Sequence, residues 1–414
     1  MPNLSQAQRV RPYHYHCDMA SRYRQIAFYA LYVMIPAIIY SKALITVCYA
    51  IMVVMAIMTQ IQERRFRFNK KLGALSLIGV AVVISVINSA DVGQWWHHVV
   101  IKLPFLIIPF AFMALGSIPK SVVRTLHLVL VVVLSISALP LLLDIIQNHE
   151  QLLDRISRGQ AIDTPIEHVK YSMFLAYGVV SAFIWRLHYS EDLDSGEPIV
   201  FVIGGSFLFL MLHLLAVRTG LVITYAILAL FGMQLAWSKK LSIPKVGMAI
   251  AVTVLGVFLL AQIPMIQHKL GYMFYDWQQY VAHGGINYSD SERLFSLKTG
   301  WDLFCNNLLL GTGMGDLYDS CVDIYQQASR TEVINYPHSQ YVYQLAGTGI
   351  IGFLLFIGGY LYPLRSKAGS YYLMLIALYL NYSLSFLVEN SFERSISVAF
   401  FLIFAVALMS RSED

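Results

Sequence analysis

The chain has 414 residues with a net charge of +5, of which 57% are apolar and only 13% are charged. Soluble globular proteins carry about a quarter charged residues, so this composition indicates an integral membrane protein. It excludes a soluble enzyme, a DNA-binding module and a secreted disulfide scaffold. The apolar residues form blocks of about 17 to 25, the length of a helix that crosses a bilayer. They lack the alternation over about ten residues that is typical of an outer-membrane barrel.

The hydropathy pattern predicts an all-α, polytopic membrane protein with about twelve transmembrane helices. The predicted spans are 25–41, 43–61, 72–88, 99–115, 122–146, 167–187, 198–216, 220–237, 246–264, 338–362, 371–388 and 395–409. The first 24 residues are polar and rich in aromatic side chains, and the apolar run that follows is as long as a full span. We therefore expect no cleavable signal peptide.

Lys and Arg residues are unevenly distributed between the two sides of the membrane. With the N-terminus inside, 18 of the 29 Lys and Arg residues lie in inward-facing segments and 9 in outward-facing ones. Lys102 and Lys170 lie within predicted spans, and acidic residues show the opposite bias. Because short cytoplasmic segments are enriched in Lys and Arg, we expect both termini in the cytoplasm.

Two long segments then face outward, residues 147–166 and 265–336. A connection as long as the second one is usually functional or partly helical. The predicted organisation is one integrated membrane domain in three parts. Residues 1–264 hold nine transmembrane helices, residues 265–337 form the outward helical segment, and residues 338–414 hold the last three helices.

The larger outward segment carries helix signals. Ser289 to Glu292 reads Ser-Asp-Ser-Glu, which is a capping box. Apolar residues then recur at helical spacing on one face: Leu294, Leu297, Trp301 and Phe304. This pattern predicts an amphipathic helix, a break at the glycine-rich run 311–316, and a second short helix over about 316–327. The run lacks the Gly-Lys-Ser/Thr of a phosphate loop and follows no strand, so we interpret it as a turn between helices.

The cysteines and histidines give little sign of a bridge or a metal site. Cys305 and Cys321 both lie in the outward segment, where a disulfide could persist. Nothing in the sequence fixes their separation, however, and two buried thiols are the simpler interpretation. His97 and His98 are adjacent and point apart, and no metal-ligand spacing occurs. We expect neither a metal nor a cofactor.

Five ionisable side chains are predicted to lie near the outer face: Lys102, Lys170, Arg218, Arg293 and His338. Ionisable groups at membrane depth are costly and are often functional. Their convergence favours a site for a polyanion such as a pyrophosphate, because guanidinium groups bind phosphate bidentately. A histidine beside them can accept a proton from a hydroxyl.

Each of these side chains also has a structural interpretation. The two lysines could extend to the lipid headgroups, and Arg218 could bind a lipid phosphate. Arg293 could form a surface ion pair with Asp290 or Glu292, and His338 could bond to a carbonyl at the membrane interface. The sequence leaves these alternatives open.

Several motifs resemble a known family. They are Arg218-Thr219-Gly220 after an apolar span, Ser291-x-Arg293 followed by Gly300-Trp301-Asp302-Leu303-Phe304, the run Leu310 to Asp316, and His338-Ser339-Gln340-Tyr341 followed by Gly347 to Gly352. In order, spacing and topology they resemble the O-antigen ligase and polymerase superfamily of bacterial membrane glycosyltransferases, and most closely the ligases. The resemblance is sharp over about 215–355 and covers the rest only in hydropathy. Leu308 departs from it, since many relatives have proline there. Weaker matches are His168-x-Lys170-Tyr171-Ser172, Glu389-Asn390 and Glu393-Arg394.

The resemblance implies an enzyme of the bacterial inner membrane whose outward segment is periplasmic. Such enzymes take a glycan from undecaprenyl diphosphate and pass it to a hydroxyl of the lipid A core oligosaccharide, with inversion and without a metal. The implied partners are the lipid-linked donor, the lipid A core acceptor and membrane lipids, with no nucleic acid. The implied catalytic residues are His338, Arg218 and Arg293, and the implied substrate-binding residues are Lys170, His168, Lys102 and Gln340.

Two other functions remain open at this point. A polymerase of the same superfamily uses the same Arg and His positions and transfers the glycan to another lipid-linked glycan. A secondary transporter has a similar number of spans, but its site lies near the midplane and its halves often repeat. The only midplane candidates here are His127 and His213, and both are interpreted as core histidines.

Overall fold

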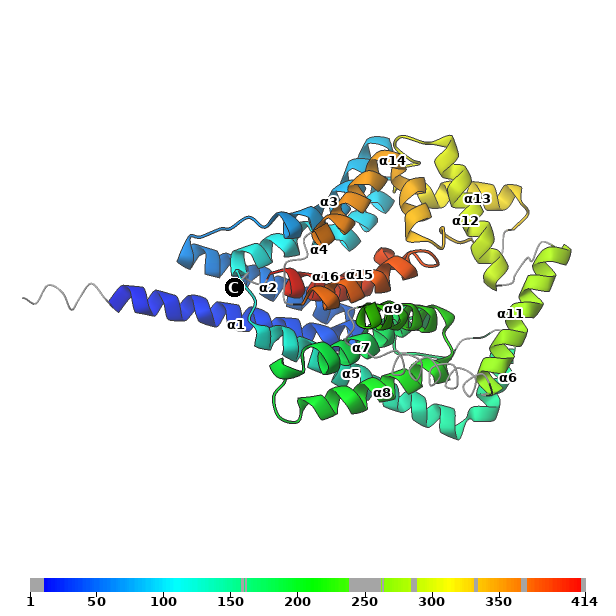
Figure 1. Ribbon diagram of the computed structural model, residues 1–414. Helices are drawn as coiled ribbons and strands as arrows, with labels where there is room; N and C mark the ends of the chain where they lie inside the picture. Colours follow the sequence, from blue (N-terminus) through cyan, green and yellow to red (C-terminus); the bar gives the residue numbers. More distant parts are fainter. Residues whose placement is uncertain are drawn as a thin grey trace, which may run out of the picture.

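The computed structural model describes residues 11–157, 160, 162–237, 262, 264–283, 289–330, 334–365 and 371–410, and every regular element in them is a helix (Figure 1). The α-helices are α1 (Arg11–Tyr40), α2 (Lys42–Glu63), α3 (Lys70–Ile84), α4 (Val92–Leu115), α5 (Lys120–Gln147), α6 (His149–Ser157), α7 (His168–His188), α8 (Glu197–Leu215), α9 (Arg218–Trp237), α11 (Pro264–His283), α12 (Ser289–Asn306), α13 (Leu317–Gln327), α14 (Gln340–Leu361), α15 (Tyr372–Ser385) and α16 (Ser395–Met409). Short 3-10 helices are η1 (Ser85–Asn88), η2 (Ser190–Asp192), η3 (Tyr362–Arg365) and η4 (Ser391–Glu393). The predicted all-α fold is confirmed over the described residues.

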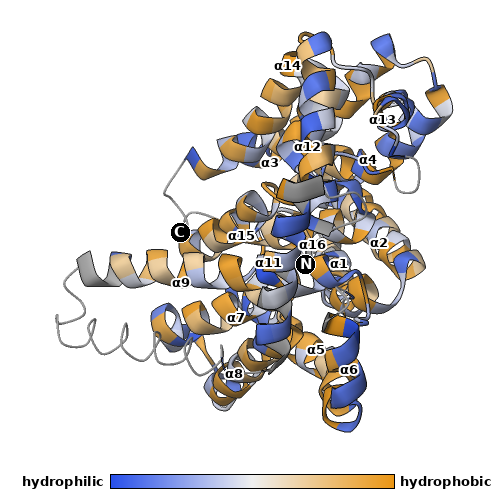
Figure 2. Cartoon of the chain, turned by 90° about the vertical axis from the view of Figure 1, so that its right-hand side faces the viewer, coloured by the Kyte–Doolittle hydropathy of each residue, from blue (hydrophilic) through white to orange (hydrophobic). Residues whose placement is uncertain are grey.

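Six described segments are long and apolar enough to cross a membrane, and each coincides with a predicted span: α2, α3 with η1, α4, α5, α8, and α14 with η3. The apolar helices α15 and α16 lie at predicted spans but are shorter, with 14 and 15 residues. Helix α9 also lies at a predicted span, and its apolar stretch Arg218–Gln234 is shorter than the six long segments. The predicted span 246–264 falls almost entirely outside the described residues. Figure 2 shows apolar residues predominating along the bundle helices and hydrophilic ones gathered on α6 and α13. The chain is therefore a polytopic membrane protein, and the total of twelve spans stays a prediction.

The core is built around α16. All of its residues from Ile396 to Met409 are buried, as expected for a helix that is apolar on every side. It packs against α4 and α1, and its neighbour α15 packs against α7 and α9. Phe174 of α7 stacks on Phe400 of α16 with ring centroids 4.0 Å apart. The turn that joins α15 to α16 buries Phe386, Glu389, Ser391 and Phe392, whereas Leu387, Val388 and Arg394 are exposed.

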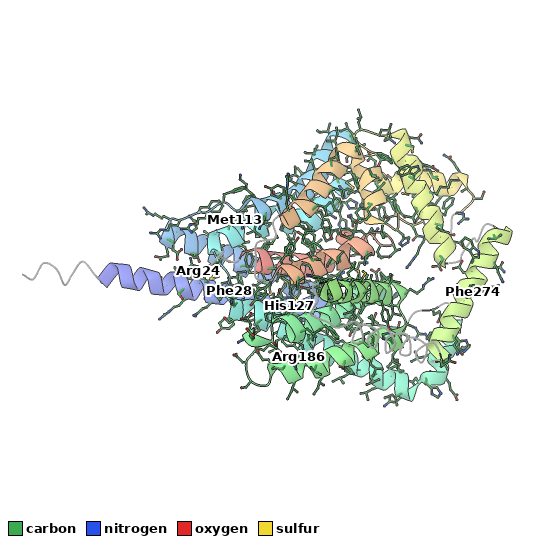
Figure 3. The ribbon with its side chains drawn as sticks, viewed as in Figure 1. Arg24, Phe28, Met113, His127, Arg186 and Phe274 are labelled. Carbon is green, nitrogen blue, oxygen red and sulfur yellow. The ribbon has the colours of Figure 1, made fainter. Side chains whose placement is uncertain are left out.

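The two predicted outward segments meet at one end of the bundle. Helix α11 contacts both α6, from the first segment, and α12, from the second. Figure 1 shows α6, α11, α12 and α13 at the end opposite to the start of α1, and Figure 3 places Phe274 of α11 far from Arg24 of α1. Which side of the membrane this end faces stays a prediction.

The glycine-rich run is a turn between α12 and α13, as predicted, and it also supports α14. That helix is broken at Gly349, which has φ 61° and ψ −169°. The N–H groups of Thr312 and Gly313 donate to carbonyls in the first half of α14 at 2.8 and 3.1 Å. The carbonyl of Leu308 accepts from the N–H of Ile350 in the second half at 2.9 Å. A broken helix at membrane depth needs such partners for its freed backbone groups.

Helix α12 packs through small residues. Its buried side chains include Ser296, Thr299 and Leu303, whereas Leu294 and Trp301, on the predicted apolar face, are exposed. The apolar face therefore points outward, where it is available to lipid or substrate. The thiols of Cys305 and Cys321 are both free.

Candidate functional site

The segment that carries His338 is fixed on two sides. The backbone N–H of His338 donates to the Ser296 hydroxyl of α12 at 3.1 Å. On the other side, the Ser339 hydroxyl donates to the carbonyl of Phe386 at 2.7 Å, and the N–H of Gln340 donates to the carbonyls of Phe386 and Glu389 at 3.0 and 3.1 Å. His338 therefore lies between α12 and the turn that joins α15 to α16.

Close packing of α12 makes this arrangement possible. A Cβ atom on Gly300 would lie 2.5 Å from Cγ of Pro337 and 2.7 Å from Cγ1 of Val342. Any larger residue at this position would push α12 away from the start of α14. This contact explains why glycine occupies the position in a helix, where it costs about 0.5–1 kcal/mol relative to Ala.

Glu389 connects His338 to Lys170. Its Oε1 lies 3.5 Å from Nδ1 of His338, and its Oε2 lies 3.3 Å from Nζ of Lys170. Lys170 also pairs with Glu167 at 2.7 Å and is 1% exposed, whereas His338 is 24% exposed. Burial raises the pKa of Glu389, but the hydrogen bond from His338 and the charges of Lys170, His338 and Arg293 outweigh it and lower that pKa to about 2. The carboxylate therefore stays ionised at neutral pH.

A second carboxylate, Glu393, follows Glu389 by four residues in the α15–α16 turn. It accepts hydrogen bonds from Nζ of Lys102 at 2.6 Å and from Nε2 of Gln340 at 2.8 Å, and it lies 3.6 Å from Nδ1 of His98. Lys102 also donates to the carbonyl of Phe392 at 2.6 Å. Although burial raises the pKa of Glu393, the charge of Lys102 and the contacts with His98 and Gln340 lower it to about 2. This network holds the α15–α16 turn in place.

Arg218 lies at the N-terminus of α9 and binds Asp290 of α12 bidentately, at 2.8 and 2.6 Å. The N-terminus of α12 is itself capped by Asp276 of α11, which accepts from the Asp290 N–H at 2.8 Å and from the Ser291 hydroxyl at 2.9 Å. Arg293 follows Asp290 by three residues and so lies on the same face of α12. Within the described ranges we find no ion pair or hydrogen bond of the Arg293 guanidinium.

The structure thus gathers the predicted residues at one end of the bundle. His338, Lys170 and Arg293 act on the Glu389 charge, and Arg218 is attached to the helix that carries Arg293. Lys102 and Gln340 are buried at Glu393. His168 begins α7, two residues before Lys170. Both lysines point at carboxylates rather than extending to the lipid headgroups.

Sequence reasoning missed the acidic half of the site. In the sequence, Glu389 and Glu393 stand out only as weak motif positions, and no pattern points to Glu167 or Asp276. The available signal was the presence of two acidic residues in a short turn between two apolar helices, where a charge requires a partner. Among the residues that the structure describes, no group of three or more His, Cys, Asp or Glu side chains is placed to hold a metal ion.

This geometry suits proton transfer beside an anion. A histidine whose Nδ1 faces an ionised carboxylate can accept a proton on Nε2, and the carboxylate stabilises the imidazolium that forms. A guanidinium without an ion partner beside it can bind a phosphate bidentately.

One comparison with known proteins finds a match. Residues 203–357 match the family described as O-antigen ligase, and no curated protein matches the chain. The matched region runs from α8 into α14 and contains Arg218, Arg293, His338 and Gln340. It ends before Glu389 and begins after Lys102 and Lys170.

Proposed function

Since the chain carries this domain and belongs to the O-antigen ligase and polymerase superfamily, we propose that it is a membrane glycosyltransferase that acts as an O-antigen ligase. It would move a glycan from undecaprenyl diphosphate to a hydroxyl of the lipid A core oligosaccharide at the periplasmic face, with inversion and without a metal. The observation that carries the proposal is the contact between His338 and ionised Glu389 at the end where Arg293 and Arg218 also lie.

His338 is the proposed base. The acceptor hydroxyl oxygen attacks the anomeric carbon of the donor sugar and gives its proton to Nε2 of His338. Glu389, facing Nδ1, holds the ring and stabilises the imidazolium. Proton transfer by a positioned side chain contributes about 10²–10⁴-fold to a rate.

Arg293 is the proposed ligand of the leaving group. As the bond between the anomeric carbon and the phosphate oxygen breaks, negative charge grows on undecaprenyl diphosphate, and stabilising such charge is often the largest contribution to catalysis. Arg218 would release Asp290 and bind the diphosphate together with Arg293. The exchange is supported by the half-exposed position of this ion pair, because exposed pairs contribute little stability.

The remaining predicted residues have supporting roles in this account. Lys170, a predicted substrate-binding residue, is buried and pairs with Glu167 and Glu389, so its proposed role is to hold Glu389 in place beside the donor site. His168 lies two residues before it at the start of α7. Lys102 and Gln340 are proposed to act on substrate indirectly, because both bind Glu393 and fix the turn that carries Glu389.

A polymerase is the nearest alternative, because it would use the same base and the same cations. The break in α14 is the one observation that favours a transporter, since transporters bind substrate at discontinuous helices. The freed backbone groups at this break are engaged by the 308–313 turn, which suits a rigid support better than an ion site.

A lipopolysaccharide gel with parallel analysis of lipid-linked glycan tests the proposal. A deletion strain is compared with the same strain carrying the wild-type gene, the His338→Ala variant, or His97→Ala as the control with an exposed histidine. Ligase activity predicts loss of every glycan-bearing band, with long undecaprenyl-linked chains accumulating, in the deletion and His338→Ala strains only. Survival of lipid A core bearing one repeat would indicate a polymerase, and an unchanged gel would overturn both.

A further inference from the structure

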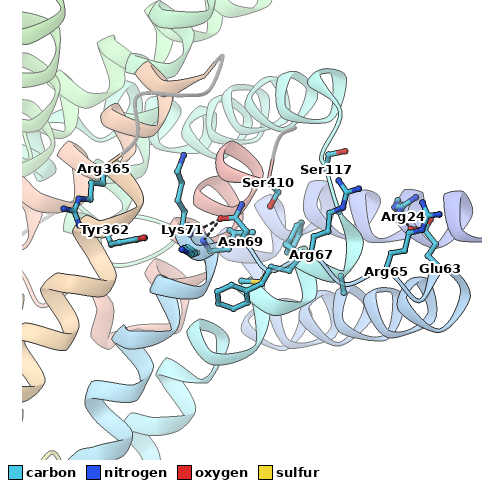
Figure 4. Close-up of a pocket in the computed structure, with 17 residues that line it drawn as sticks. Arg24, Glu63, Arg65, Arg67, Asn69, Lys71, Ser117, Tyr362, Arg365 and Ser410 are labelled. Carbon is cyan, nitrogen blue, oxygen red and sulfur yellow. Dashed lines mark hydrogen bonds and ion pairs between the residues drawn. The ribbon is translucent and has the colours of Figure 1, made fainter. Parts of the chain in front are cut away.

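Figure 4 shows a basic cavity of about 880 Å³. Arg24 and Met113, which line it, lie at the end of the bundle away from α11 and Phe274 (Figure 3). The cavity is formed by the middle of α1, the end of α2, the start of α3, the end of α4, the 3-10 helix η3 that follows α14, and Ser410 after α16. The basic side chains that line it are Arg24, Arg65, Arg67, Lys70, Lys71 and Arg365. Among the described residues that line it, Glu63 is the one acidic side chain.

Within the described ranges, most of this positive charge has no acidic partner. Arg24 donates to Glu63 at 2.5 Å and to the carbonyl of Leu115 at 2.6 Å. The other five basic side chains make no ion pair or hydrogen bond with any part of the chain that the structure describes. Like charges around one concavity repel one another, and a bound anion would relieve that repulsion.

Anion binding in this cavity would rely on side chains and not on free N–H groups at a helix N-terminus. The first N–H groups of α3 are already occupied, because Asn69 Oδ1 accepts from Lys71 N at 2.9 Å and from Leu72 N at 3.3 Å (Figure 4). An anion would therefore be bound by guanidinium and ammonium groups.

Exposed aromatic residues alternate with the basic ones. The connection from α2 to α3 reads Arg65-Phe66-Arg67-Phe68, and the two phenylalanines are 49% and 61% exposed. A soluble phosphate gives no reason for these rings, whereas a lipid offers acyl chains to the rings and a phosphate to the cations. The phenylalanines and the basic residues both lie at the ends of apolar helices, where lipid headgroups are expected.

We propose that this cavity binds the phosphate headgroup of an anionic phospholipid, with Phe66 and Phe68 against its acyl chains. Five uncompensated charges favour a headgroup with two phosphates over one with a single phosphate. The predicted orientation places the site in the cytoplasmic leaflet, away from the proposed glycan transfer. The proposal does not depend on the identity of the transferred glycan.

Lipid binding to the purified full-length protein in neutral detergent, measured by native mass spectrometry, tests this. The probes are tetraoleoyl cardiolipin, dioleoyl phosphatidylglycerol, dioleoyl phosphatidylcholine and inorganic pyrophosphate. We expect cardiolipin to bind most tightly and phosphatidylcholine not to compete. The double variant Arg67→Gln/Lys71→Gln should weaken cardiolipin binding by at least about tenfold, because each basic residue near a membrane surface contributes substantially to anionic-lipid binding.

The matched control is Lys120→Gln/Arg186→Gln, which removes two exposed charges at the same end of the bundle but outside the cavity. It should change binding by less than about twofold, and thermal unfolding verifies that both variants fold. Equal losses in the two variants would overturn the site. Displacement of cardiolipin by equimolar pyrophosphate would overturn the lipid assignment and indicate a soluble phosphate ligand.

Discussion

Nδ1 of His338 lies 3.5 Å from Oε1 of Glu389, and these two residues are separated by α14, η3 and α15 in the chain. The contact forms because backbone hydrogen bonds attach the start of α14 to the α15–α16 turn. It gives the histidine an ionised partner on one ring nitrogen and leaves the other for substrate.

Removing the charge of Glu389 should slow catalysis more than it weakens binding. In Glu389→Gln the amide keeps the shape of the side chain but no longer stabilises an imidazolium. We expect kcat for glycan transfer to fall by about 10–100-fold, within the range of acid–base contributions, while KM for the lipid-linked donor changes less than about threefold. Steady-state kinetics on the purified variant measure both. A rise in KM alone would indicate that Glu389 acts through Lys170 on donor binding.

Glu389 should also make stability depend on pH. Its pKa falls from the ordinary value of 4.5 to about 2 in the folded protein, so its contribution is present above about pH 4.5 and is lost as pH falls toward 2. The difference in unfolding temperature between the wild type and Glu389→Gln should therefore be largest near neutral pH and shrink below about pH 4. A difference that stays constant down to about pH 3 would contradict the assigned pKa.

Freeing Arg218 should improve donor binding. Asp290→Asn removes the carboxylate that Arg218 binds while leaving the backbone N–H of residue 290 to its Asp276 acceptor. If Arg218 exchanges Asp290 for a diphosphate, KM for the donor should fall about two- to tenfold in Asp290→Asn and rise in Arg218→Gln. A similar loss of activity in both variants, with lowered unfolding temperatures, would instead identify the pair as a structural attachment between α9 and α12.

The break in α14 should tolerate no side chain at Gly349. A Cβ there would lie 2.3 Å from the carbonyl oxygen of Leu309, and the backbone has φ 61°. Gly349→Ala should destabilise the protein by more than about 1 kcal/mol. Gly358, in the second half of the same helix, has open space around its Cβ position, so Gly358→Ala should leave thermal unfolding unchanged or raise its midpoint. Equal effects of the two substitutions would contradict the described break.

The sequence predicts the bundle well because the bilayer sets the length of each apolar block. The six long apolar segments coincide with predicted spans. His127 and His213 are core histidines as predicted. The first bonds to the carbonyl of Val123 and the hydroxyl of Tyr177, and the second to the carbonyl of Phe209 and the hydroxyl of Tyr225.

The acidic partners could not be predicted in the same way. Lys102 and Glu393 are 291 positions apart, and Lys170 and Glu389 are 219 apart, so only the packing of α15 and α16 brings them together. The sequence offers Asp290 and Glu292 as partners of Arg293, but in the structure they pair with Arg218 and Arg330. Local spacing cannot distinguish these arrangements, because side chains from other helices compete for the same carboxylates.

A reconstituted transfer assay tests the central claim most directly. Purified protein is supplied with an undecaprenyl diphosphate-linked glycan and lipid A core, and both the glycosylated acceptor and the released undecaprenyl diphosphate are measured. Arg293→Gln should lower the rate by at least about 10²-fold. Lys298→Gln, which removes an exposed charge from the same helix, should stay within about twofold of the wild type. Near-wild-type transfer by Arg293→Gln would contradict the account.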